Sequence, residues 1–172
     1  IMSGQPYDSP QKPFGDEEDY IFSPDSKSVL YVTKPKTGAA YALTTNTDIF
    51  QYDIASGKTT NLTEGMMGYD VAPAFSGKGT LAWLSMKRDG YESDKNDLII
   101  SSGNTHINLT ENWDGTVSGF KWSLDGSRLY FYAPIDGTIQ LFEVNNPAGT
   151  KAKPVVKQIT KGTFDINGIA GQ

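Results

Sequence analysis

The fold is decided by residues 122–132, Trp122-Ser123-Leu124-Asp125-Gly126-Ser127-Arg128-Leu129-Tyr130-Phe131-Tyr132. In this stretch an aromatic-Ser pair leads through a turn into an apolar strand. The pattern occurs twice earlier, as Phe22-Ser23-Pro24-Asp25-Ser26 and as Phe75-Ser76-Gly77-Lys78-Gly79, each followed by an apolar segment. The three aromatic residues are spaced 53 and 47 residues apart. Self-similarity at a period of roughly 50 residues is the signature of a repeat architecture.

Two further strand segments follow each turn in the same order. The first contains Asp48-Ile49, Asp97-Leu98 or Gln140-Leu141, and the second contains Asn61-Leu62-Thr63, Asn108-Leu109-Thr110 or Gln158-Ile159-Thr160. The segments are rich in β-branched and aromatic residues, as half-buried strands are. We therefore predict an all-β fold: a β-propeller with about three complete four-stranded antiparallel blades. A β-sandwich is the alternative, but it does not predict four landmarks that repeat in register.

The turn between the first two strands of each repeat has recognisable chemistry. The ring of Pro24 presets the backbone angle of the second position of a type I turn, and Asp25 is expected to bond its own backbone. Gly126 supplies the permissive position that closes the hairpin. Ser26 stands where this glycine is expected, which we predict the turn tolerates.

The repeat also predicts domain boundaries. Complete blades are expected over residues 14–66, 67–113 and 114–162. Residues 1–13 are expected to hold the outer strand of a preceding blade and residues 163–172 the start of a following one. Propellers close with about four to eight blades. We therefore expect the chain to be part of a larger propeller or to associate with itself through open blade faces.

Composition excludes several classes of function. A formal net charge of −5 and a pI near 4.8 argue against a nucleic-acid surface, which needs a basic stripe. No apolar run approaches the length of a membrane span. The absence of cysteine excludes disulfides and thiolate metal sites but leaves the compartment open. The Asn-Leu-Thr sequences match the glycosylation sequon, but each is an instance of the repeated motif, so we interpret the match as a coincidence.

The chain offers little catalytic chemistry. It has no Gly-x-Ser-x-Gly motif, no phosphate-binding glycine loop and a single histidine, His106, without the context of a catalytic triad. We expect no catalytic residue, cofactor or metal. The candidate substrate-binding residues come from two charged segments that are expected in the longer connecting loops: Glu17, Glu18, Arg88, Tyr91 and Glu92. Their alternative interpretation is that of solvated loop residues.

The repeated motifs resemble those of a known family. Residues 68–76, Gly68-Tyr69-Asp70-Val71-Ala72-Pro73-Ala74-Phe75-Ser76, and the following Ala82-Trp83-Leu84-Ser85-Met86 and Arg88-Asp89-Gly90-Tyr91-Glu92 carry most of the likeness. Together with Gly119-Phe120-Lys121-Trp122-Ser123 they are similar to the N-terminal propeller of the prolyl oligopeptidase family. Within it, the bacterial dipeptidyl aminopeptidase and acylaminoacyl-peptidase branch is the most similar.

This resemblance implies a non-catalytic propeller that gates peptide access to an α/β-hydrolase domain downstream, which carries the Ser-Asp-His triad of a serine exopeptidase. It implies peptide substrates, and a bacterial periplasmic or otherwise extracytoplasmic location, with the cytoplasm as the alternative. A glutamate pair in dipeptidyl peptidases holds the substrate's amino terminus, and Glu17-Glu18 is the pair to which this role could be carried over. The alternatives are a non-enzymatic TolB-like propeller that binds proteins and a glycan-processing propeller.

Overall fold

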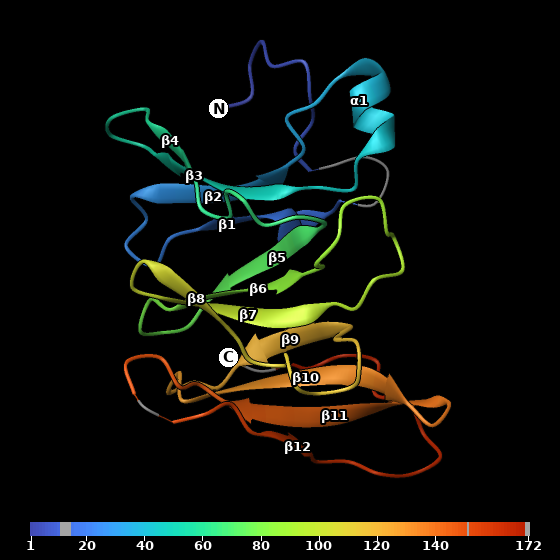
Figure 1. Cartoon of the computed structure of the whole chain (residues 1–172). Coiled ribbons are helices and arrows are strands. Elements are labelled where there is room, and N and C mark those ends of the chain that lie inside the picture. The colour runs from blue at the N-terminus through green and yellow to red at the C-terminus, as the bar shows by residue number, and fades with distance from the viewer. Residues whose placement is uncertain (11–14, 151, 171–172) are drawn as a thin grey trace. The chain divides into compact units, whose positions relative to one another are not determined.

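The structure is a computed structural model that describes residues 1–10, 15–150 and 152–170. The chain forms two compact units, which we describe separately. The first contains Ile1–Pro73 and Ser85–Asp94, and the second contains Ala74–Leu84 and Lys95–Gln172. Strands dominate, and each of the three sheets has four of them (Figure 1). In the described part of the chain, no helix has the length and apolar character needed to cross a bilayer.

Each sheet is a meander in which strands consecutive in sequence lie side by side. The first sheet contains β1 (Tyr20–Phe22), β2 (Ser28–Thr33), β3 (Asp48–Asp53) and β4 (Thr59–Asn61). The second contains β5 (Asp70–Phe75), β6 (Leu81–Ser85), β7 (Asp97–Ser102) and β8 (Thr105–Asn108). The third contains β9 (Gly119–Trp122), β10 (Arg128–Ile135), β11 (Thr138–Asn145) and β12 (Val156–Gln158). The predicted three four-stranded antiparallel repeats are confirmed.

The turn that opens each sheet forms as the sequence predicts. Asp25 accepts hydrogen bonds from the Ser23 hydroxyl at 2.7 Å and from the backbone N–H of Lys27 at 3.1 Å. In the third sheet Asp125 accepts the corresponding bonds from Ser123 at 2.7 Å and from the N–H of Ser127 at 2.9 Å. These bonds hold the pKa of both carboxyl groups below its usual range, with the Ser23 bond the largest contribution for Asp25 and the Ser127 N–H bond for Asp125.

A buried threonine hydroxyl ties the end of the outer strand to the start of the third strand in the first two sheets. Thr63 Oγ1 accepts the N–H of Ile49 at 3.0 Å and donates to Asp48 Oδ1 at 3.2 Å. Thr110 repeats both bonds, to Leu98 at 3.0 Å and Asp97 at 2.8 Å. We call this arrangement the threonine clasp.

The clasp explains the Asn-Leu-Thr motif. Asn61 Oδ1 accepts the N–H of Thr63 at 3.0 Å, and Asn108 accepts the N–H of Thr110 at 2.9 Å, so each Asn side chain closes its own turn. Both threonines are fully buried. The motif therefore has a structural role, since each threonine hydroxyl already forms two hydrogen bonds with the third strand.

The interior of each sheet is apolar. Leu30, Val32 and Ile49 of the first sheet are completely buried, and so are Leu129 and Phe131 of the third. The aromatic cluster of the third sheet stacks Phe131 on Phe142 at 5.3 Å between ring centroids and sets Trp113 edge-on at 5.2 Å from Phe131. At about 25 cal/mol per Å² of apolar surface, such buried side chains dominate the stability of each sheet.

One expectation needs correction. The outer strands lie before the predicted Leu-Thr segments, because the clasp threonine turns the backbone out of the sheet. The chain also forms a short helix, α1 (Gly38–Leu43), whose alanines favour helix, and a single 3-10 turn, η1 (Glu17–Asp19), which precedes β1.

The two ends of the chain form no strand in the part that the structure describes. Residues 1–10 and 163–170 hold turns and bends, whereas residues 11–13 and 171–172 lie outside the described residues, as does Phe14 at the start of the first predicted blade. The part-blades expected at residues 1–13 and 163–172 stay predictions. Segment 164–166 bonds β11: Gln140 Nε2 donates to the carbonyl of Phe164 at 2.7 Å and the N–H of Ile139 to Asp165 at 2.8 Å.

We predict that Ser26→Gly stabilises the protein by about 0.5–1 kcal/mol. Ser26 has a backbone φ of +57°, a left-handed conformation that costs a residue with a Cβ about 1–2 kcal/mol. Glycine avoids this cost, but it loses more conformational entropy on folding than serine does, which offsets part of the gain. Urea unfolding followed by tryptophan fluorescence measures the change.

Gly126→Ser is the matched control because Gly126 occupies the equivalent position at φ +67°. There a Cβ would lie 3.3 Å from Ser76 Cβ, so this exchange is expected to destabilise the protein. An unchanged or lower stability of Ser26→Gly would contradict the assignment of strain to Ser26.

Candidate functional site

Two loops of the first unit meet through one carboxylate. The loop between β2 and β3 carries α1, and the loop between β6 and β7 contributes residues 86–94 to the same unit. Asp89 Oδ1 accepts hydrogen bonds from the Thr44 hydroxyl at 2.7 Å and from the backbone N–H of Thr45 at 2.7 Å. In return, the N–H of Gly90 donates to Thr45 Oγ1 at 2.9 Å. These bonds join residues 44–45 positions apart in sequence, and we call the arrangement the loop anchor.

The loop anchor depends on the ionised form of Asp89. The hydrogen bond from Thr44 and those from the backbone of Thr45 and Asn46 lower the pKa of the Asp89 carboxyl, against a smaller opposing effect of burial. A lowered pKa means that the anchor is fully formed above the ordinary aspartate pKa and is lost as the pH falls through the folded value. At neutral pH the two loops are therefore held together.

A buried lysine stabilises the first of these loops from within. Lys34 is 5% exposed, and its ammonium donates to the carbonyls of Thr44 at 2.7 Å and Tyr41 at 3.1 Å. The same ammonium lies 4.1 Å from the centre of the Tyr41 ring, a cation–π contact. Burial lowers the pKa of Lys34, while the charges of Asp89 and Glu92 oppose that decrease. The lysine thus fixes the backbone on which Thr44 reaches Asp89.

The exposed part of the second loop is ordered by Arg88. Its guanidinium binds both oxygens of Asp94, each at 2.9 Å, and stacks 4.1 Å from the centre of the Tyr91 ring. Tyr91 nevertheless remains 54% exposed. The loop therefore presents an aromatic ring to solvent on a base that is fixed by ion pairing and by the loop anchor.

Glu92 follows Tyr91 in the sequence and is exposed. Burial raises the pKa of the Tyr69 hydroxyl, and the negative charge of Glu92 adds to the rise, so its carboxylate lies near Tyr69. The structure thus brings together three of the predicted site residues, Arg88, Tyr91 and Glu92, in one loop.

The backbone at the base of this loop is tightly packed. Gly68 has a φ of +84°, and a Cβ built there would lie 2.7 Å from the carbonyl oxygen of Met86. The N–H of Met86 donates to the carbonyl of Tyr69 at 2.7 Å. Only glycine fits position 68, because any side chain would push the segment away from the loop.

The other two predicted residues, Glu17 and Glu18, are elsewhere in the same unit. They form the exposed 3-10 turn η1, whose first N–H is capped by Asp16 at 2.8 Å. Among the described residues, neither glutamate forms an ion pair, and no hydrogen bond joins them to loop 86–94. They remain a separate, untested candidate for binding a cation or an ammonium group.

The remaining polar and aromatic candidates have packing roles. His106 sets its ring edge-on against Trp83 at 4.9 Å, and burial lowers the pKa of its imidazole. Trp83 is 1% exposed, and Trp122 donates its indole N–H to the carbonyl of Ala74 at 3.1 Å. In the described ranges, no group of three or more His, Cys, Asp or Glu residues is arranged to hold a metal ion.

Sequence reasoning missed Asp89, Thr44, Thr45 and Lys34 as partners. Asp89 stands inside the segment that was singled out, but nothing in the local sequence shows that it bonds residues 44–45 positions earlier. The one available signal was the length of both loops, which exceeds that of the two-residue connection between β10 and β11, residues 136–137, in the third repeat.

No family model matches the chain, but several curated proteins are similar to it in sequence. The chain is 42% identical over 170 residues to dipeptidyl-peptidase 5 of Porphyromonas gingivalis, an alignment that covers 96% of this chain and 24% of that protein. It is 40% identical over 171 residues to dipeptidyl-peptidase 5 of Porphyromonas endodontalis, covering 98% and 24%. A third dipeptidyl-peptidase 5, from Trichophyton tonsurans, is 32% identical over 161 residues. The chain spans about a quarter of the length of these relatives.

Solved structures agree on the fold. A putative TolB from Agrobacterium tumefaciens superposes with a TM-score of 0.63 at 18% identity, covering 86% of this chain and 47% of the other. The acylaminoacyl peptidase of Pyrococcus horikoshii superposes with a TM-score of 0.61 at 15% identity, covering 84% and 21%. These likenesses show a propeller fold, and the sequence relatives are dipeptidyl peptidases. The chain is thus similar in sequence to part of dipeptidyl-peptidase 5 and has a propeller-like fold, as an N-terminal propeller of the prolyl oligopeptidase family would.

Proposed function

We propose that this propeller is the non-catalytic part of a serine exopeptidase of the dipeptidyl-peptidase type, and that it controls which peptides reach an α/β-hydrolase domain. The observation that carries the proposal is the 42% identity to dipeptidyl-peptidase 5 of Porphyromonas gingivalis over 170 residues. A likeness to a family does not by itself define a role, which must be argued from particular residues. In this chain the residues that could contact peptides lie in the loops.

Loop 86–94 is the element that we assign to peptide contact. The loop anchor and the Arg88–Asp94 ion pair fix its base, and Tyr91 and Glu92 are exposed at its tip. A preorganised loop loses little conformational entropy when a ligand binds. An exposed tyrosine offers apolar area to peptide side chains, and Glu92 offers a carboxylate to peptide N–H groups or cationic side chains. Glu17 and Glu18 are kept in the proposal as a second acidic contact.

The alternative is a non-enzymatic propeller like TolB that binds other proteins. Its support is the fold alone, because the superposed TolB structures are 18% and 20% identical to this chain. The sequence relatives favour the peptidase. We also propose a location in the bacterial periplasm or otherwise outside the cytoplasm, for which the support is the family resemblance and which fractionation of producing cells tests.

The first test is the longest reading frame that contains this chain. We expect its product to release chromophore from dipeptide p-nitroanilides, whereas the 172-residue chain alone releases none. A frame without a downstream Gly-x-Ser-x-Gly motif and later Asp and His residues would overturn the proposal.

The second test addresses the loop in that full-length product. Glu92→Gln is expected to raise KM for peptides of six to ten residues about threefold to tenfold, with kcat unchanged, because it removes binding energy common to the ground and transition states. The KM of a dipeptide p-nitroanilide is measured in parallel by steady-state kinetics. Because this short substrate should not reach loop 86–94, its KM should change least, which separates loop contacts from active-site contacts. Glu64→Gln, an exchange at another exposed glutamate, is the control. Equal effects of both exchanges would contradict a role of loop 86–94.

The third test concerns the loop anchor and uses the 172-residue chain. Asp89→Ala removes the acceptor of three hydrogen bonds and is expected to increase trypsin cleavage after Lys87 and Arg88 about tenfold, because local opening exposes the loop. Cleavage of the unmodified chain should increase in the same way when the pH falls below the ordinary aspartate pKa and passes through the lowered pKa of Asp89, because the carboxylate is then protonated. This measurement uses a protease that is active in acid. Ser93→Ala is the control, and an unchanged cleavage rate in Asp89→Ala would show that the anchor does not hold the loop.

A further inference from the structure

A lysine completes the threonine clasp of the second blade. The Lys95 ammonium lies 2.8 Å from Asp97 Oδ1 and donates to the carbonyl of Thr110 at 2.7 Å. Asp97 also accepts the hydroxyl of Thr110, so the ammonium joins the two members of the clasp. It supplies positive charge to a carboxylate whose side chain is 17% exposed. Buried carboxylates need such a partner, because the protein interior solvates a lone charge poorly.

The first blade repeats this clasp with Asn46 in place of the lysine. Asp48 receives the bond from the clasp threonine, as Asp97 does in the second blade. Asn46 precedes Asp48 by two residues, just as the lysine precedes Asp97. An asparagine side chain is shorter than that of lysine and carries no charge. The first blade therefore has no side-chain ammonium at this position.

The backbone shows that the two positions are equivalent. The N–H of Asp70 donates to the carbonyl of Thr47 at 3.3 Å, and the N–H of Val117 donates to that of Asn96 at 3.0 Å. Thr47 and Asn96 are the residues directly before the two clasp aspartates. Both blades thus enter their third strands through the same backbone bond, and the exchange of lysine for asparagine changes the side chain at an equivalent place.

Two neutral oxygen atoms accompany Asp48 in the first blade. The carbonyl of Thr63 accepts the N–H of Met66 at 2.9 Å, as that of Thr110 accepts the corresponding N–H at 3.0 Å. A carbonyl oxygen can accept two bonds, and Thr110 takes its second from the lysine. Asn46 Oδ1, at the position of the lysine, is buried and accepts no hydrogen bond from the described residues. Both oxygens can therefore act as ligands.

Asp48 is the charged group of this place and lies in the interior. It is 8% exposed and forms no ion pair with a described residue. Burial raises the pKa of its carboxyl, against the bonds from Asn61 and Thr63. The charges of Glu64 and Lys36, whose side chains are both exposed, act on it in opposite directions. Its negative charge is therefore not balanced by the side chains around it.

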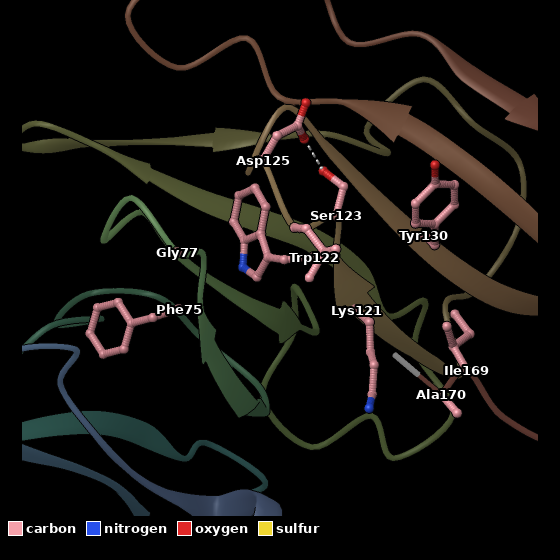
Figure 2. A pocket seen from close by; sticks show the side chains of 10 residues that line it. Phe75, Gly77, Lys121, Trp122, Ser123, Asp125, Tyr130, Ile169 and Ala170 are labelled. Carbon is pink, nitrogen blue, oxygen red and sulfur yellow. Dashed lines mark hydrogen bonds between the residues drawn. The ribbon is translucent and has the colours of Figure 1, made fainter. Parts of the chain in front are cut away.

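The third blade needs no cation at the corresponding place. Gln140, at the position of Asp48, is neutral, and its amide donates to Thr138, two residues earlier, at 3.1 Å. The turn aspartate of this blade, Asp125, is exposed and bonded to Ser123 (Figure 2), so water solvates its charge. Among the three clasps, a buried carboxylate that has no positive partner in the described part of the chain thus occurs in the first, at Asp48.

We propose that a small monovalent cation, K⁺ or NH₄⁺, binds in the first blade to Asp48, the Thr63 carbonyl and Asn46 Oδ1, where the lysine ammonium lies in the second. One carboxylate and neutral oxygens balance a single positive charge. Ca²⁺ takes about six to eight oxygens, with carboxylates among them. The described residues contain no group of three or more His, Cys, Asp or Glu side chains placed for a metal ion.

The ion has the structural role that the lysine has in the second blade. It joins the end of the outer strand to the start of the third strand and balances the buried carboxylate. Because it binds the folded chain, it stabilises the blade by mass action. This inference goes beyond the proposed peptidase function and does not depend on it.

Thermal unfolding of the 172-residue chain in two chloride salts tests whether such an ion binds. In about 100 mM KCl the midpoint should be about 2–4 °C higher than in tetramethylammonium chloride of the same ionic strength, because a bound ion stabilises the folded chain. Tetramethylammonium has the same charge, but it is too large for the place of one ammonium group. Circular dichroism follows the transition. Equal midpoints in the two salts would overturn the proposal.

Asn46→Lys is the matched variant, since it places the lysine of the second blade into the first. Its own ammonium should take the place of the ion. The midpoint of this variant should therefore rise in tetramethylammonium chloride and no longer differ between the two salts. A difference between the salts as large as that of the unmodified chain would show that K⁺ acts elsewhere, and this result would contradict the site.

A nuclear magnetic resonance titration locates the ion. When KCl replaces tetramethylammonium chloride at constant ionic strength, the amide signals of Ile49 and Met66, which bond the clasp threonine, should shift and saturate. The equivalent amides of Leu98 and Trp113 should not, because the lysine fills the corresponding place. Shifts of equal size in both blades, or shifts that do not saturate, would overturn the proposal.

Asp48→Asn removes the charge but keeps an acceptor for the clasp threonine. It should raise the dissociation constant of K⁺ at least about tenfold, because a charged ligand becomes neutral. The same spectra show whether the variant is folded, and an unchanged constant in the folded variant would contradict the role of Asp48. A parallel titration with NH₄Cl distinguishes the two ions, since the one with the lower dissociation constant is the one that the site prefers.

Discussion

A buried threonine hydroxyl is the constraint on which the first two blades depend. In each of them Thr63 or Thr110 accepts the N–H of the second residue of the third strand and donates to the aspartate that begins this strand. The hydroxyl thereby satisfies backbone and side-chain groups that the end of a short outer strand would otherwise leave unpaired in the interior. With only three or four residues, β4 and β8 have few ladder bonds of their own. The clasp fixes their register and so closes each blade on its outer side.

The same clasp also shows what variation the repeat allows. In the third blade Thr160 accepts the N–H of Leu141 at 2.8 Å, but Gln140 replaces the aspartate. Its amide, 1% exposed, no longer meets the threonine and donates instead to Thr138 and to the carbonyl of Phe164. A neutral amide with two donors can reach a following segment, whereas a carboxylate could only accept. One exchange in the motif thus redirects a bond within a blade to the segment after it.

The parts of this structure that are local in sequence could be predicted, and the parts that depend on distant partners could not. The Asp25 and Asp125 turns and the strand order followed from residues within a few positions of one another. The ends of β4 and β8 were misjudged because Thr63 and Thr110 bond residues 12–15 positions away, which draws the Leu-Thr segment out of the sheet. The end of β12 was misjudged for the same reason, since Thr160 bonds Leu141, 19 positions away. Of the candidate site, Arg88, Tyr91 and Glu92 were identified in the sequence. The bond of Asp89 to Thr44, across 45 positions, exists only once the fold has formed.

The loop anchor and the buried Lys34 are therefore best understood together. Lys34 binds the carbonyls of Tyr41 and Thr44, and Thr44 in turn binds Asp89, so one cation and one anion fix two loops that lie on different sheets of the chain. Neither charge is paired directly with the other in these bonds; the backbone and hydroxyl groups between them are polarised by both. Such a network makes the position of loop 86–94 a property of the folded propeller, whereas Tyr91 and Glu92 at its tip remain open to change. Exchanges at the tip of the loop should therefore cost the fold little as long as the anchor is kept.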